Sequence, residues 1–505
     1  MNDAFRFDGR NLDAGFWDRL LASSPQQIHD FLTSADSLPA PEHRKVKTIA
    51  IFYHRYCCGG IERVLSEQFA YFLNLGYKVV FLTEEQPSDS DFSLPPQVVR
   101  LRIPSQDPMT RLNALREIFE RHGVDLYYTH ASFARQTLWD LLIVRFALNR
   151  RVVVHAHGIF PCSLVWGEND LQHRLDLYGL ADKVVVLTRA DAFYYRAFGV
   201  NCSYIPNPLP EIARQDVSAD GRFASRTVLS VGRICSVKQT LDVLRIAHVL
   251  QREDPSIRFL IVGSREDFNY WNRVQSLYRE CGLGATVDFM DYTTEIADVY
   301  RKGSALLVTS QLEGFPMVMA EALGCGLPVI SYEMPYVEFM RMPDSGILTV
   351  PPGDIDCFAR RILDLFSDRE RYRRLIENAR TAYERMVSDS ALERKYAALV
   401  GELSGDRMAE TSDDAGVTDD ARCAFQALLQ QLPVFTRVTY ERGWRGGAES
   451  VKDAGTWKCR LSGVKDLLHF ARKAVWTLRN KGWGEFRTKV CKRLRVLKNR
   501  LTGGK

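Results

Sequence analysis

The sequence predicts an α/β protein with two domains, each built around a parallel, doubly wound sheet. Short β-branched runs alternate with helical patterns twice along the chain, which is typical of parallel sheets with crossover helices. A proline-rich break at residues 205–210, Ile-Pro-Asn-Pro-Leu-Pro, separates the two series. A length of 505 residues also suits two or three domains better than one core. We therefore expect domains at residues 46–205 and 206–403.

Residues 1–45 predict a short helical extension. Apolar residues from Phe16 to Leu32 recur at helical spacing, and Pro39 and Pro41 end the pattern. We expect this extension to pack onto the body or onto a partner, and we assign it no chemistry.

The body contains twelve expected strands. In the first domain they cover residues 48–53, 78–82, 98–101, 125–128, 152–155 and 183–187. In the second domain they cover residues 227–231, 258–262, 286–289, 305–308, 328–331 and 346–350. Expected helices of the second domain cover residues 238–252, 268–281, 294–302 and 354–402.

The end of the chain differs in composition from the body. Residues 404–456 are rich in Asp, Gly, Thr and Ser and predict a linker. Residues 458–505 hold 15 Lys and Arg against two acidic residues, so they carry +13, and the remainder carries −8. Apolar residues recur there at helical spacing, with Trp476 and Trp483 among the cations, which favours a tail (residues 457–505) on an anionic membrane surface. Nucleic-acid binding, which we do not expect, and a partner helix are the alternatives.

Composition and missing motifs exclude several classes. No apolar run approaches the ~18 residues that span a membrane, and the charged N-terminus lacks a signal-peptide pattern. Eleven cysteines without a Cys-x-x-Cys pair indicate reduced thiols in a cytoplasmic compartment. Motifs of serine hydrolases, zinc proteases and Walker-type nucleotidases do not occur.

Residues 313–321, Glu-Gly-Phe-Pro-Met-Val-Met-Ala-Glu, carry the strongest functional signal. They follow a buried strand and open a short helix after Pro316, a residue well suited to a helix start. Ligands of open α/β sheets bind at such strand ends, and a helix N-terminus attracts phosphate. A carboxylate would repel phosphate, so Glu313 and Glu321 are better suited to the hydroxyls of a sugar and a ribose. The alternative is two surface glutamates on an ordinary helix.

This segment resembles the signature of the retaining glycosyltransferases of family 4, and the resemblance extends from about Lys47 to about Leu403. It implies the GT-B fold, in which two Rossmann-like domains face a cleft and a last helix, here residues 387–403, crosses back to the first domain. It also implies that Glu313 contacts the donor sugar and Glu321 the ribose. Backbone groups around the phosphates would come from Gly314, Phe315, Pro316, Met317 and Val318.

Gly59 and Gly60 follow the first strand of the body and let the backbone approach a ligand closely. With Glu62 they match the Gly-Gly-x-Glu of the family, where this loop faces the donor phosphates and the acceptor. An ordinary tight turn is the alternative.

Gly232, Arg233 and Lys238 follow the first strand of the second domain. Cations that pair with a departing pyrophosphate lower the barrier to glycosyl transfer without a metal. The spacing resembles the phosphate clamp of the family, although Gln239 stands where the family usually has glycine. Two solvated surface cations are the alternative.

His155 and His157 lie on one face of a strand end. A metal site would need further ligands, and Cys162 alone is thin support. The resemblance places His157 beside the transferred sugar, as a hydrogen-bonding group rather than a nucleophile. His130 lines the acceptor side or is structural, with equal weight. No Asp-x-Asp suits a nucleotide-bound metal, so we expect no metal and no cofactor beyond the nucleotide-sugar co-substrate.

The sequence thus predicts a retaining, metal-independent glycosyltransferase, peripheral on the inner face of the cell membrane. It would move a sugar from a nucleotide-diphosphate sugar, with a UDP-sugar favoured over GDP-mannose, to a cell-surface polysaccharide or a lipid-linked glycan. The catalytic candidates are His157, Arg233, Lys238 and Glu313. The alternative is a non-catalytic subunit of the same fold that binds a nucleotide or glycan and recruits a partner.

Overall fold

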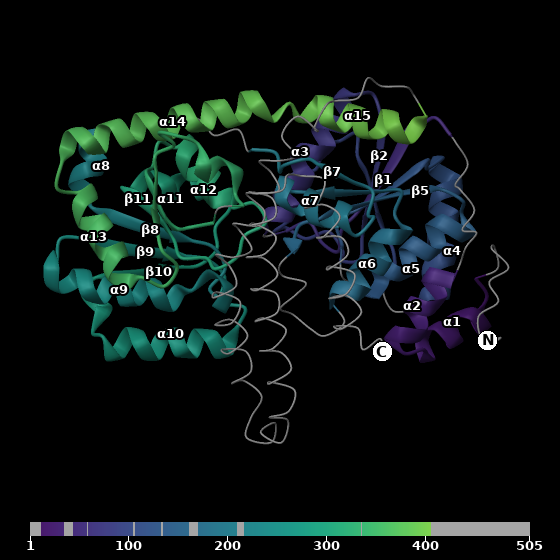
Figure 1. Ribbon diagram of the computed structural model, residues 1–505, viewed down its shortest axis with the longest axis horizontal. Coiled ribbons are helices and arrows are strands. Elements are labelled where there is room, and N and C mark those ends of the chain that lie inside the picture. Colours follow the sequence, from purple (N-terminus) through teal and green to yellow (C-terminus); the bar gives the residue numbers. More distant parts are fainter. Residues whose placement is uncertain are drawn as a thin grey trace, which may run out of the picture. The chain divides into compact units, whose positions relative to one another are not determined.

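The computed structural model describes residues 12–34, 44–57, 59–104, 107–132, 135–160, 170–209, 217–334 and 336–405 (Figure 1). The chain divides into two compact units. The first unit runs up to Pro206 and resumes at Leu392, and the second is Asn207–Ala391. The predicted linker at 404–456 and the basic tail at 457–505 lie outside the described residues, apart from the last turn before Asp406.

The first unit holds a seven-stranded sheet in the order β3-β2-β1-β4-β5-β6-β7, with every neighbouring pair parallel. Its central strands are buried along their whole length, because helices cover both faces of the sheet. The strands are β1 (Thr48–Phe52), β2 (Lys78–Thr83), β3 (Val99–Arg102), β4 (Leu126–Thr129), β5 (Arg151–Ala156), β6 (Lys183–Val186) and β7 (Cys202–Tyr204).

The helices of the first unit form two layers. Helix α15 (Leu392–Ser404) packs on α3 (Gly60–Asn74), and the rings of Tyr396 and Phe72 lie 5.3 Å apart. The remaining helices between the strands of the first unit are α4 (Pro108–His122), α5 (Arg135–Leu142), the π-helix Ile143–Ala147, α6 (Asp170–Leu180) and α7 (Arg189–Ala197).

The N-terminal helices α1 (Ala14–Ala22) and α2 (Pro25–Ser34) pack onto the first unit, against α4 and α6. Asp13 caps α1 by accepting a hydrogen bond from the Phe16 N–H at 2.8 Å. The Trp17 side chain is buried, and His29 contacts Asp176 of α6 at 2.8 Å.

The second unit holds a six-stranded parallel sheet in the order β10-β9-β8-β11-β12-β13. In Figure 1, α9 and α10 lie on one side of this sheet, and α12 and α14 lie on the other. The strands are β8 (Thr227–Val231), β9 (Arg258–Val262), β10 (Val287–Met290), β11 (Ala305–Val308), β12 (Val329–Tyr332) and β13 (Ile347–Val350). The helices are α8 (Ala219–Ser225), α9 (Thr240–Glu253), α10 (Phe268–Glu280), α11 (Ile296–Lys302), α12 (Met317–Gly324), α13 (Ile355–Leu365) and α14 (Arg369–Ser390), with 3-10 turns at Ser236–Lys238, Leu283–Ala285 and Glu338–Arg341.

The predicted fold class of parallel, doubly wound α/β domains is confirmed, with two local corrections. The single helix expected at 354–402 is three helices, because Asp368 caps a new helix and Ala391 adopts a left-handed φ of 43°. The three-residue strand β7 was not predicted. Among the described residues, no helix has the length and apolar character needed to cross a bilayer.

Candidate active site

A pocket opens in the second unit at the carboxyl ends of β8 and β11, where ligands of open α/β sheets bind. Four of the predicted donor-binding residues line it: Gly232, Arg233, Lys238 and, from α12, Val318. Its lining consists of Ser230, Val231, Gly232, Arg233, Lys238, Thr240, Ile261, Leu307, Val308, Thr309, Ser310 and Val318.

The floor of this pocket depends on two glycines. The Gly232 N–H donates to the Val262 carbonyl at 2.9 Å, which draws the ends of β8 and β9 together. A Cβ atom on Gly263 would lie 1.9 Å from the Gly232 carbonyl oxygen, and Gly232 itself has a φ of 141°. Only glycine fits both positions, so the loop that carries Arg233 is set by backbone packing.

Gln239 stands where the family usually has glycine, and hydrogen bonds stabilise the turn around it. Gln239 adopts a left-handed φ of 51°, which is the reason a glycine suits this turn. Its side-chain Nε2 donates to the Ser236 carbonyl at 2.6 Å, and Thr309 Oγ1 donates to the Lys238 carbonyl at 2.8 Å. These two hydrogen bonds hold the turn despite the Cβ, so Lys238 keeps a fixed backbone position.

Lys238 and Glu313 form an ion pair, with Nζ and Oε1 2.5 Å apart. Both side chains are partly buried, and the Glu313 N–H donates to the Tyr336 hydroxyl at 3.0 Å. Arg233 is exposed. The sequence assigned Lys238 to phosphate and Glu313 to sugar, and the structure shows that the two charges neutralise each other. A bound anion would compete with Glu313 for the lysine.

Helix α12 begins at Met317, and Pro316 is its capping residue rather than its first helical residue. The Met317 N–H donates to the Phe315 carbonyl at 2.9 Å, and the Met319 N–H donates to the Pro316 carbonyl at 3.0 Å. These two donors therefore already have partners. Gly314 lies in the bend before the helix, as does Phe315.

Glu321 lies one turn further along α12 and is 5% exposed. Its Oε2 accepts a hydrogen bond from the Tyr300 hydroxyl at 2.7 Å. This contact fixes the carboxylate in an orientation that the sequence gave no means of predicting, since Tyr300 belongs to α11.

In the first unit, Gly59 caps α3 and Gly60 begins it. The Glu62 side chain folds back over this cap and is 1% exposed as a residue, with its Oε1 2.9 Å from Nε of Arg55. A Cβ atom on Gly59 would lie 2.1 Å from Glu62 Oε2. The glycine therefore makes room for the carboxylate, and Glu62 contacts its own loop.

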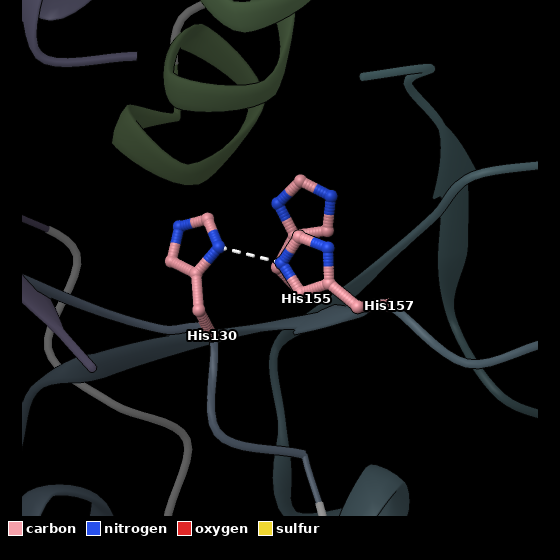
Figure 2. Close-up of side chains that lie close together, drawn as sticks. All are labelled: His130, His155 and His157. Carbon is pink, nitrogen blue, oxygen red and sulfur yellow. Dashed lines mark hydrogen bonds between the residues drawn. The ribbon is translucent and has the colours of Figure 1, made fainter. Parts of the chain in front are cut away.

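His130, His155 and His157 form a histidine layer at the carboxyl ends of β4 and β5 (Figure 2). His130 Nδ1 lies 2.7 Å from His157 Nε2, and His130 Nε2 lies 2.7 Å from Gln68 Oε1. His155 Nδ1 lies 3.0 Å from the Tyr128 hydroxyl. The structure thus joins the two histidines that the sequence put on the sugar and acceptor sides.

The histidine layer is held in its neutral form. Burial lowers the pKa of His157 to about 3, and burial together with the neighbouring histidines lowers the pKa of His130 and of His155 well below the usual value. Neutral imidazoles hydrogen-bond hydroxyl groups without attracting phosphate.

The potential ligand atoms of the layer lie within 4.8 Å of one another, a spacing that allows a metal ion to be considered. The rings, however, are stacked: those of His155 and His157 have centroids 4.4 Å apart and planes 15° apart. A metal lies in the plane of each imidazole that binds it, so near-parallel rings do not direct their lone pairs to one point. The observed arrangement is that of a hydrogen-bonded stack.

Comparison with known proteins identifies the family. The profile described as Glycosyltransferase Family 4 matches residues 58–210, and the profile described as Glycosyl transferases group 1 matches residues 219–382. Together they cover 317 of the 505 residues. Both halves of the chain thus match glycosyltransferase profiles, and the chain is similar to the family 4 glycosyltransferases. The resemblance seen in the sequence is thereby confirmed.

Curated relatives are similar over parts of their length. A D-inositol 3-phosphate glycosyltransferase of Streptomyces bingchenggensis is 30% identical over 46% of this chain and 54% of its own. The α-1,4-N-acetyl-D-galactosaminyltransferase of Campylobacter jejuni that acts on an undecaprenol-linked acceptor is 26% identical over 40% and 55%. An uncharacterised glycosyltransferase of Haemophilus influenzae is 29% identical over 30% and 42%. The chain spans about half the length of these relatives.

Solved structures share the fold of the described body. Sucrose-phosphate synthase from Thermosynechococcus elongatus aligns with a TM-score of 0.59 at 20% identity, over 71% of this chain and 99% of that one. HepE of Anabaena, solved with UDP and glucose, aligns with a TM-score of 0.59 at 16% identity, over 71% and 100%. These structures confirm the predicted fold class, in which each unit is a Rossmann-like domain of the kind found in GT-B proteins.

Proposed function

We propose that this chain is a retaining, metal-independent glycosyltransferase that moves a sugar from a nucleotide-diphosphate sugar to a polysaccharide or lipid-linked glycan. The observation that carries the proposal is the pocket at the end of β8, where Gly232, Arg233 and Lys238 meet the start of α12. The two glycosyltransferase profile matches support the reaction class.

The pocket of the second unit suits the diphosphate. Lys238 and Arg233 supply two positive charges, and charge-assisted hydrogen bonds to phosphate are among the strongest that proteins make. When phosphate takes the lysine, Glu313 is released from its ion pair and can accept hydrogen bonds from sugar hydroxyls. The same contact thus links donor binding to orientation of the sugar.

In the proposed reaction, the bond between the anomeric carbon and the β-phosphate oxygen breaks, and its electron pair stays on the phosphate. The acceptor hydroxyl oxygen forms the new bond on the same face, and its proton passes to the departing phosphate oxygen. Arg233 and Lys238 stabilise the charge that develops on that phosphate. Metal independence follows in the proposal from these two cations.

Glu321 supplies recognition of the ribose in this proposal. Its carboxylate is buried and oriented by the Tyr300 hydroxyl, so it is held in place to accept hydrogen bonds. A UDP-sugar is the favoured donor over GDP-mannose. HepE was solved with UDP-glucose, and TarM of S. aureus with UDP and α-GlcNAc-glycerol, which supports this choice.

The acceptor and the location are further parts of the proposal. The Campylobacter relative acts on an undecaprenol-linked glycan, and an Erwinia amylovora relative serves amylovoran biosynthesis. A lipid-linked or cell-surface acceptor would place this enzyme on the inner membrane face, held by the basic tail at residues 457–505.

A donor screen tests the proposal. Thermal unfolding of the full chain is measured with a panel of nucleotide sugars, and the donor that stabilises most is used in a transfer assay with a lipid-linked glycan, with and without a chelator. We expect a rise in Tm, transfer with retained anomeric configuration, and no loss on chelation. Binding without transfer or hydrolysis from any donor would favour the non-catalytic subunit.

A further inference from the structure

Gln68 of α3 begins a hydrogen-bonded chain that ends at His157. Its Oε1 lies 2.7 Å from His130 Nε2, and His130 Nδ1 lies 2.7 Å from His157 Nε2, the contact drawn in Figure 2. Gln68 and His130 are 0% and 1% exposed. Water therefore has little access to these two residues, and His130 has a hydrogen-bond partner at each ring nitrogen.

These hydrogen bonds determine which ring nitrogen of His130 and of His157 carries the proton. A neutral imidazole carries one N–H and one lone pair, and an amide oxygen can only accept. With the oxygen of Gln68 facing it, His130 donates through Nε2–H and accepts through Nδ1. His157 must then donate through Nε2–H, which leaves His157 Nδ1 without a proton.

We propose that Gln68, acting through His130, is a positioning residue that holds His157 in the tautomer whose Nδ1 accepts a hydrogen bond from a substrate hydroxyl. The inference rests on the proposed function and deepens it, because it names the group that His157 recognises. That group is a hydroxyl donor, on the transferred sugar or on the acceptor. It is not a carboxylate, a phosphate or a carbonyl, none of which has a proton to donate.

His155 fixes the plane of the ring. It stacks on His157 at 4.4 Å and contacts the Tyr128 hydroxyl at 3.0 Å. The ring of His157 is thus held by a neighbour on its face and by His130 at its edge. Orientation and tautomer together determine the direction from which a hydroxyl must approach.

The tautomer is tested on the full chain by NMR with ¹⁵N-labelled histidine, in the absence of substrate. In the unmodified protein, we expect His157 Nδ1 to show the shift of an unprotonated nitrogen and Nε2 that of a protonated one. Gln68→Met keeps the side-chain length but removes the acceptor, so both His157 shifts should move toward an average of two tautomers. Tyr71→Phe, a small change on the same helix, should leave them unchanged.

Two spectra would overturn the inference. One is a protonated Nδ1 on His157 in the unmodified protein, which would mean that the amide of Gln68 faces the other way. The other is a His157 signal that Gln68→Met leaves unaltered. Neither result depends on transfer activity, so the inference about the His157 tautomer can fail while the proposed function stands.

Kinetics then identify the hydroxyl. Loss of one ordered neutral hydrogen bond is expected to lower kcat/KM in Gln68→Met about threefold to tenfold. A rise in KM for the donor assigns the hydroxyl to the sugar, and a rise in KM for the acceptor assigns it to the acceptor. Unchanged kinetics in Gln68→Met, with the tautomer shift observed, would overturn recognition by His157. Absence of transfer in the unmodified protein would overturn the proposed function alone.

Discussion

The two units carry opposite chemistry at equivalent places, the carboxyl ends of their central strands. In the second unit, charged side chains gather there, with Lys238 paired to Glu313 and Arg233 exposed. In the first unit, the same edge holds three imidazoles whose pKa values burial keeps low, so they stay neutral. In the proposal, one fold plan thus serves an anion in the second unit and uncharged hydroxyl groups in the first.

The comparison explains why the sites are built differently. An anion site gains from cations that keep some contact with water and can exchange partners, as we propose for Lys238 between Glu313 and phosphate. A hydroxyl site gains from groups with a fixed donor or acceptor sense, which burial and a hydrogen-bonded chain provide.

Lys238→Ala should have the largest effect. Removing a cation that stabilises the departing diphosphate is expected to lower kcat about 10² to 10³-fold. Transfer from the best donor of the screen is the measurement, and circular dichroism checks the fold. Lys302→Ala, an exposed lysine at the end of α11, is the matched control and should retain full activity. Equal loss of transfer activity in both variants would show that the overall positive charge of the protein, and not Lys238 itself, determines the rate.

Gly263→Ala tests whether backbone packing sets the pocket. The new Cβ would meet the Gly232 carbonyl oxygen at 1.9 Å, so the ends of β8 and β9 must move apart. We expect the free energy of unfolding to fall by about 1–3 kcal/mol and donor binding to weaken with it. Gly282→Ala is the control, because Gly282 also has a positive φ but faces open space. A smaller loss of stability in Gly263→Ala than in Gly282→Ala would refute the packing argument.

Glu321→Gln should act on the donor alone. The amide keeps the shape of the buried side chain and its contact with Tyr300 but loses the charge that strengthens hydrogen bonds to hydroxyls. We expect KM for the donor to rise about tenfold, with little change in Tm. A 2′-deoxyribose donor should show the same weakening in the unmodified enzyme and no further loss in the variant. A further loss there would place the ribose elsewhere.

The histidine layer predicts a dependence of stability on pH. Histidines with lowered folded-state pKa values take up protons on unfolding, so their contribution is present above about pH 6.5 and is lost as pH falls toward the folded values, about 3 for His157. In this window, each histidine should lower the free energy of unfolding by at most about 1.4 kcal/mol for each pH unit of acidification. Urea unfolding at pH 7, 6 and 5 measures the slope. Stability that rises on acidification would contradict a neutral layer.

The fold could be predicted from sequence because strand and helix patterns alternate so regularly. Strand β8 (Thr227–Val231) and strand β9 (Arg258–Val262) match their predicted bounds. Strand β7 was missed because three residues give no periodicity. The break at Ala391 was missed because an alanine carries no signal for a left-handed φ.

The composition of the site was less accessible. The sequence could place Lys238 and Glu313 at two strand ends, and neighbouring parallel strands bring such ends together. The sequence carries no sign of their ion pair, because the two residues lie 75 positions apart and their contact depends on the direction of both side chains in the folded protein. His130 next to His157 could have been found from the pairing of β4 with β5. Gln68, Tyr300 and Tyr336 carry no motif, and only packing reveals them. The binding roles of all these residues stay predictions.

The most direct test of the contrast between the two units is the affinity for UDP, measured by calorimetry in three forms of the full chain. If the diphosphate is held by the second unit, Lys238→Ala should weaken UDP binding at least about tenfold, as expected for loss of a charge-assisted contact. His157→Asn should leave UDP affinity within about twofold while kcat/KM for transfer falls. Weakened UDP binding in His157→Asn with unchanged binding in Lys238→Ala would contradict the account.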